Sequence, residues 1–143
     1  MKKRLSALLL LLLAALYSYL QKPATSGDTP AAASASAIAR AYRDHQSNLQ
    51  VSGSGVVQAL LPDDRSGSRH QKFLLRLPDG QTLLIAHNID LAPRIPALRK
   101  GDTVQFCGEY EWNEKGGVVH WTHHDPAARH TPGWLLHKGR KYQ

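Results

Sequence analysis

From residue 49 onward, apolar and polar residues alternate in short runs, which is the pattern of half-buried β-strands. Turn residues bound the runs, most clearly at Pro78-Asp79-Gly80, where the sequence predicts a hairpin. The five expected strands cover residues 50–61, 70–77, 81–87, 102–113 and 117–123. The expected core residues are Phe73, Leu75, Leu83, Ile85, Val104 and Phe106.

Two stretches depart from this alternation. Before the strands, apolar residues recur at i, i+3, i+4 and i+7, which predicts a short amphipathic helix over about residues 34–46. The residues at this spacing are Ile38, Ala41, Tyr42 and His45. Residues 88–101 contain two prolines and predict an irregular crossover with one helical turn.

The order of the expected elements indicates the fold class. A long glycine-containing strand, a hairpin, a crossover and a second hairpin are the order of a five-stranded OB-type barrel. Residues 98–108 also resemble the entry into the fourth strand of such barrels. We therefore expect a mainly β fold, a small five-stranded OB-like barrel preceded by a short N-terminal helix. Another small β-barrel or an α+β sheet is the alternative.

The N-terminus has the pattern of an export signal. Basic residues 2–4 precede an uncharged apolar run over residues 5–20. Ala24-Thr25-Ser26 fits a cleavage site, so residues 1–26 are expected to act as a signal peptide that releases a periplasmic or secreted protein. The alternative is an uncleaved segment that anchors the chain in the inner membrane, with the domain outside. Residues 27–37 are interpreted as a linker, and residues 38–143 as one OB-like domain with a C-terminal tail.

Charge and cysteine content restrict the partners. After residue 26 the chain keeps 14 of its 18 basic residues and all 11 acidic ones, a net charge of +3, which does not support nucleic acid as a partner. Contact with a membrane is expected only through residues 1–26, if they stay uncleaved. Cys107 is the single cysteine, so an intramolecular disulfide is excluded and we expect this thiol to be buried.

Histidines gather near the C-terminus, where five of the eight fall in the last 24 residues. Histidine is the commonest metal ligand, so a divalent metal such as zinc is the expected cofactor if a site exists. Its candidate ligands are His120, His123, His124 and Asp125, with Glu109 and Glu111 nearby. Trp121 and His70 complete the candidate ligand-site residues. The alternative is that these histidines are wall, turn or exposed residues.

Strand geometry decides which of these side chains can meet. Within a continuous strand His120 and His123 point to opposite faces, so both can bind one metal only if the strand ends near Thr122. The turn before this strand decides the partner of His120. A bulged turn, which we prefer, would set Tyr110 opposite His120, whereas a two-residue turn would set Glu109 there.

Three stretches, residues 108–113, 120–126 and 133–135, resemble the bacterial domain of unknown function 3465 family. The family's hallmark is the His-Trp-Thr-His string, which stands here at residues 120–123. The resemblance covers about residues 38–143 and implies a small bacterial protein of this length. It implies no activity, because the family is one of unknown function.

Two functional hypotheses follow. The first is a non-enzymatic binding module of the cell envelope, whose ligand is an anion, an oligosaccharide, a nucleic acid or a metal, although the charge does not support nucleic acid. The second is a metal-dependent, nuclease-like hydrolase that uses the segment 120–125. The sequence contains no Gly-x-Ser-x-Gly, Cys-x-x-Cys or His-Glu-x-x-His motif, so whether the chain is an enzyme is left open.

Overall fold

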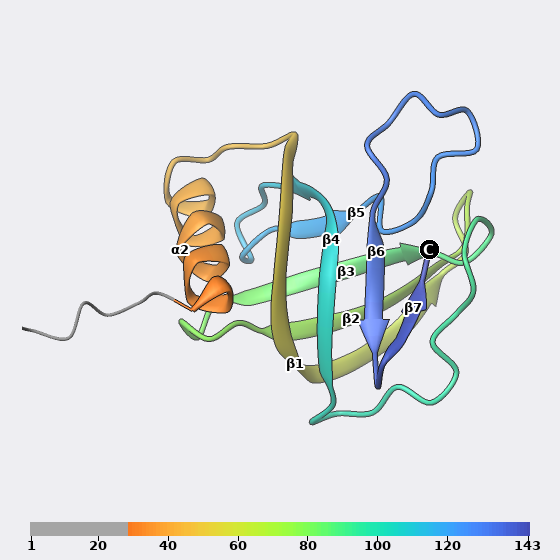
Figure 1. The fold of residues 1–143 in the computed structure, drawn as a ribbon, viewed down its shortest axis with the longest axis horizontal. Helices are drawn as coiled ribbons and strands as arrows, with labels where there is room; N and C mark the ends of the chain where they lie inside the picture. The colour runs from red at the N-terminus through yellow and green to blue at the C-terminus, as the bar shows by residue number, and fades with distance from the viewer. Residues whose placement is uncertain (1–28) are drawn as a thin grey trace, which may run out of the picture.

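The structure of the protein, a computed structural model, describes residues 29–143. The expected signal peptide at residues 1–26 lies outside this part of the chain. In order, the elements are α2 (Pro30–Arg43), β1 (Leu49–Asp64), β2 (His70–Arg76), β3 (Thr82–Asn88), β4 (Thr103–Glu111), β5 (Val118–His120), β6 (Trp134–His137) and β7 (Arg140–Tyr142) (Figure 1). Among residues 29–143, no helix is both long enough and apolar enough to cross a lipid bilayer.

Five strands pair in a closed ring in the order β1-β2-β3-β5-β4 and back to β1. The contact between β3 and β5 is parallel and the other contacts in the ring are antiparallel. The ring closes because β1 bends: residues 49–56 pair with β4 and residues 56–64 pair with β2 (Figure 1). The mainly β fold with one short helix is thus confirmed. The five strands of the ring lie where five strands were expected, and β6 and β7 bring the sheet of residues 29–143 to seven strands.

Glycines let β1 pass close to its neighbours. A Cβ atom at Gly53 would lie 2.8 Å from the Phe106 ring, and one at Gly55 would lie 2.9 Å from the Arg76 carbonyl oxygen. Real Cβ atoms do not approach this closely, so larger residues would push β1 off the core.

The interior of the ring holds the hydrophobic core. All six core residues expected from the alternating pattern are 0% exposed. They are Phe73, Leu75, Leu83, Ile85, Val104 and Phe106. Ile38 and Ala41 of α2 join the same cluster, so the helix packs against the core. Because Phe106 and every second residue of β4 point inward, the residues between them point outward.

Helix α2 begins earlier than expected. The Thr29 side chain accepts a hydrogen bond from the Ala32 N–H, and Pro30 occupies the first turn, where its missing N–H does no harm. The helix ends at Arg43, two residues before His45 adopts a positive φ of 52°. The helix thus includes residues 30–33, which precede its expected start at about residue 34.

The hairpin between β4 and β5 differs from the preferred interpretation. β5 ends at His120 instead of residue 123, and Glu109, not Tyr110, pairs with His120. The bulged turn was the wrong choice. Gly116 and Gly117 both have positive φ, and a Cβ at Gly117 would lie 2.2 Å from the Tyr110 ring, so the loop wraps onto Tyr110.

The C-terminal tail, for which no strands were expected, forms part of the sheet. The tail forms the hairpin of β6 and β7, in which β6 pairs with residues 104–107 of β4 and so shares one edge of that strand with β5. Lys138 and Gly139 make its tight turn with φ of 49° and 78°. The crossover at residues 88–101 is irregular, as expected, and it contains one helical turn, in which the Ala92 N–H donates to the Asn88 carbonyl oxygen at 3.1 Å; Ile95 is buried there.

Candidate functional site

The outer face of β4 and β5 brings together two carboxylates and an imidazole. Glu109 and Glu111 share this face because side chains two apart on a strand point the same way. His120 lies opposite Glu109 in the register of the two strands. His120 Nε2 is 3.6 Å from Glu109 Oε1 and 3.7 Å from Glu111 Oε1. We call these three residues the Glu–His cluster.

The geometry of the Glu–His cluster suits a metal ion. One ligand atom from each residue can be chosen so that all lie within 4.8 Å of one another. His120 Nε2 is itself shielded from solvent and has no hydrogen-bond partner among residues 29–143. Carboxylate oxygens and an imidazole nitrogen fit zinc, manganese or iron, and three protein ligands leave coordination positions open.

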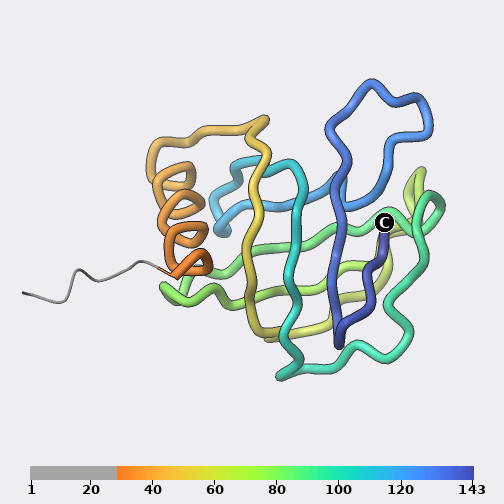
Figure 2. Tube along the Cα trace, in the orientation of Figure 1, coloured from red at the N-terminus to blue at the C-terminus, as the bar shows by residue number. Residues whose placement is uncertain are grey.

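His130 reaches the same cluster from the loop between β5 and β6. Residues 121–133, the His130 loop, project from the ring (Figure 2). His130 Nε2 lies 2.6 Å from Glu109 Oε2, and its Nδ1 lies 2.8 Å from the Thr131 carbonyl oxygen. A carbonyl and an ionised carboxylate only accept, so these two contacts favour the imidazolium form, in which both ring nitrogens donate. The ring stacks on Trp121, with centroids 4.0 Å apart and planes 8° apart.

The pKa values of this pair shift in opposite directions. Burial lowers the pKa of His130, but its hydrogen bonds to Glu109 and to the Thr131 carbonyl outweigh this effect and raise it. Burial raises the pKa of Glu109, yet the hydrogen bond from His130 and the nearby imidazoles bring it below its usual value. The charged forms of Glu109 and His130 therefore stabilise each other.

Asp125 shapes the His130 loop instead of joining the Glu–His cluster. Its carboxylate accepts hydrogen bonds from the backbone N–H groups of Ala127, Arg129 and His130, at 2.9, 2.8 and 2.9 Å. These bonds hold the pKa of Asp125 below its usual value. Asp125 thus fixes the backbone at His130, and it is not among the described residues whose ligand atoms lie at metal-site distances.

Thr122 and His123, the second half of the His-Trp-Thr-His string, are buried. Thr122 is fully buried, and its hydroxyl lies 2.8 Å from His87 Nδ1, while His87 Nε2 lies 3.1 Å from the Pro93 carbonyl oxygen. A carbonyl only accepts, so Nε2 donates and Nδ1 accepts from Thr122. Burial is the main reason why the pKa of His87 falls to about 4, with His123 and His70 nearby adding to the shift. His87 is therefore neutral at pH 7.

The remaining predicted residues lie apart from the Glu–His cluster. His123 is 3% exposed and its Nδ1 contacts the His124 carbonyl at 2.7 Å, whereas His124 is exposed. His70, at the start of β2, contacts the Ser68 carbonyl at 2.8 Å. Within residues 29–143, no group of three ligand atoms at metal-site distances includes His70, His123, His124 or Asp125.

Sequence reasoning missed two histidines of this region. His87 carried no motif, although its burial follows from its place on β3. His130 lies on a loop whose path no spacing rule predicts. Its only local signal was its position five residues after Asp125, which a proline follows in a turn-forming pair. Cys107, expected to be buried, is half-buried on the outer face, where the Gln50 Nε2 donates to its sulfur at 3.3 Å.

Comparison with known proteins places the chain in a family. A search of curated proteins finds no match. The model of the DUF3465 family, described as "Protein of unknown function", matches residues 20–143, which is most of the chain. The protein therefore belongs to the DUF3465 family.

Proposed function

We propose that this protein is an exported, non-enzymatic binding module of the cell envelope that holds a divalent metal ion in the Glu–His cluster. The observation that carries the proposal is the convergence of ligand atoms from Glu109, Glu111 and His120 within 4.8 Å. The ring order with a parallel contact between β3 and β5 supports an OB-like barrel as its scaffold.

Charge supports a cation at this place. Two carboxylates side by side repel each other unless positive charge lies between them. At present the partner charge comes from His130, which touches only one oxygen of Glu109. His120 Nε2, without a partner among the described residues, gains a bond when it ligates a metal. A divalent ion thus satisfies all three side chains at once.

The test is a calorimetric titration of the purified protein with zinc and with manganese. His120→Ala and Glu111→Gln remove one ligand each, and we expect both to lose at least about tenfold in affinity. The matched controls are His124→Ala and Glu114→Gln, which change exposed residues of the same types outside the cluster. Equal affinity of all five proteins, or no binding by the wild type, refutes the metal site.

Export is a separate part of the proposal with its own test. Residues 1–37 are fused to a reporter that is active only in the periplasm, and we expect activity that is lost when residues 2–4 are made neutral. A reporter that is expressed but inactive contradicts export and leaves the metal site untouched.

A metal-dependent hydrolase is the second candidate function. One observation favours it: three protein ligands, partly exposed at 20–34% of their side-chain surface, leave room for a metal-bound water. The zinc- or manganese-loaded protein is assayed with bis(p-nitrophenyl) phosphate. Turnover that disappears in His120→Ala but not in His124→Ala would move the protein from binding module to enzyme.

A further inference from the structure

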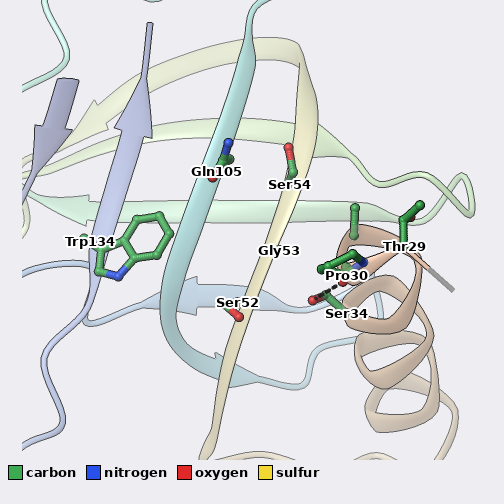
Figure 3. A pocket seen from close by; sticks show the side chains of 9 residues that line it. Thr29, Pro30, Ser34, Ser52, Gly53, Ser54, Gln105 and Trp134 are labelled. Atoms are coloured by element: carbon green, nitrogen blue, oxygen red, sulfur yellow. Dashed lines mark hydrogen bonds between the residues drawn. The ribbon is translucent and has the colours of Figure 1, made fainter. Parts of the chain in front are cut away.

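A hollow lies between the N-terminal turn of α2 and the outer face of β1 and β4. It has a volume of about 460 Å³, within the range of about 300–1,000 Å³ that small-molecule sites occupy. Figure 3 shows Trp134 at one end, Pro30 and Ser34 at the other, and Ser54 and Gln105 between them. We call it the Trp134 groove.

The lining of the Trp134 groove is aromatic and polar but uncharged. None of its nine lining residues, all within the described part of the chain, carries a charge, although 20% of the whole chain is charged. An anionic ligand would find no ion-pair partner among these residues. A purely apolar ligand would cover hydroxyl and amide groups without bonding them, which costs free energy.

Strand register arranges the polar groups in the floor of the groove. Ser54 of β1 pairs directly with Gln105 of β4, and in the next outward row Ser52 pairs with Cys107, which pairs with Trp134. No hydrogen bond joins Ser52, Ser54 or Gln105 to another residue drawn in Figure 3, where Ser34 bonds to the Pro30 carbonyl. Two hydroxyls and one amide, which can donate and accept, therefore remain for a ligand.

Trp134 gives the groove a flat wall. The ammonium group of Lys141 lies 5.2 Å from the centroid of its ring and comes from β7, on the side of β6 away from β4. This contact helps to fix the indole. A sugar ring matches such a site, because its C–H face stacks on an aromatic ring while its hydroxyls exchange hydrogen bonds with amide and hydroxyl groups.

We propose that the Trp134 groove binds a neutral oligosaccharide, with one sugar ring stacked on Trp134 and its hydroxyls bonded to Gln105 and Ser54. The groove shares no lining residue with the Glu–His cluster: Gln105 and Glu109 are four residues apart on β4, roughly 13 Å at the rise of a strand, and Trp134 pairs with Cys107, two residues before Glu109. Saccharide binding therefore needs no ion in the Glu–His cluster, although a longer chain would run along β4 toward it.

The test uses the full chain as cells produce it, in detergent if its N-terminal segment is retained. Chitotriose, cellotriose and maltotriose are each titrated at up to millimolar concentration, with binding followed by tryptophan fluorescence and by the indole N–H signals in NMR spectra. We expect at least one to bind and to shift the Trp134 signal, which the spectrum of Trp134→Phe assigns. Trp134→Ala should weaken binding by at least about tenfold.

Controls separate this site from the rest of the surface. Leu60→Ser changes an exposed residue of the same strand β1, far along from Ser54, and should bind as the wild type does. Glu111→Gln should also bind normally, so failure of the metal site leaves this result intact. No response to any of the three sugars overturns the proposal, as does tighter binding of the anionic trigalacturonate or unchanged binding by a folded Trp134→Ala.

Discussion

Two histidines on the neighbouring strands β3 and β5 have opposite surroundings: His87 lies inside the ring and His120 outside it. His87 is 0% exposed, has both ring nitrogens bonded to uncharged partners, and is neutral. His120 faces outward beside two carboxylates, and its Nε2 has no partner among residues 29–143. A buried polar group that is satisfied holds the fold together, whereas an unsatisfied one at the surface is available for a ligand.

The same contrast between inside and outside holds for the two faces of β4. Two substitutions in the middle of this strand test it most strongly. Phe106 points inward and Gln105 outward, at adjacent positions of one strand. Phe106→Ala should lower the free energy of unfolding by about 3–5 kcal/mol, because it leaves a cavity in the core. Gln105→Ala should change it by no more than about 0.5 kcal/mol. Urea unfolding measures both, and similar losses would show that the two faces do not differ as described.

Because His87 is buried and neutral, the stability of the protein should depend on pH. The pKa of His87 is about 4 in the folded protein against 6.5 in the unfolded chain, so the unfolded chain binds the proton more readily. Stability should be complete above pH 6.5, fall as the pH drops from 6.5 to 4, and lose about 3 kcal/mol over that window.

A variant separates this effect from other titrations. His87→Gln removes the titrating group, and the fall in unfolding free energy between pH 6.5 and 4 should shrink by most of that amount. His124→Ala, an exposed histidine, should keep the wild-type dependence. An unchanged slope in His87→Gln contradicts the depressed pKa.

If His120 and its two carboxylate neighbours bind a metal ion, the stability of the protein should depend on that ion. Zinc at about a hundredfold over its dissociation constant should raise the free energy of unfolding by about 2.7 kcal/mol, since a ligand that binds only the folded state stabilises it. With a loss of affinity of about tenfold, Glu111→Gln should lose about half of this gain, whereas Glu114→Gln should keep it. Thermal unfolding with zinc and after chelation measures the difference; an equal gain in both variants places the zinc elsewhere.

The fold was predictable where alternation alone decides it. Phe73, Leu83 and Phe106 were assigned to the core correctly, because one buried face imposes a period of two on every strand of the ring. The tail was missed because β6 is only four residues long and gains its pairing from β4, far away in sequence. Its signal was the Lys138-Gly139 turn between short alternating runs.

The site was predictable only in part, for reasons of register and loop path. His120 was one of the predicted ligands, and Glu109 and Glu111 were recognised as nearby, but two adjacent glycines allowed either register in the hairpin. The packing of Gly117 on Tyr110 made the choice, and that contact is tertiary. His130 depends on three backbone hydrogen bonds to Asp125 and on Trp121 at a φ of 52°, which no local pattern specifies.

The smallest expected effect separates the two histidines most directly. In the absence of metal, His120→Ala should change the free energy of unfolding by no more than about 0.5 kcal/mol, because its Nε2 makes no hydrogen bond that could be lost and the residue is partly exposed. Its removal also takes away a polar atom that is shielded from water without a partner, so a slight gain in stability fits equally well. Urea unfolding after exhaustive chelation is the measurement, with His87→Gln as the matched inner variant, which should be clearly less stable at pH 7. A loss in His120→Ala as large as that in His87→Gln would mean that the outer histidine holds the fold together, and the Glu–His cluster would then be part of the scaffold instead of a binding site.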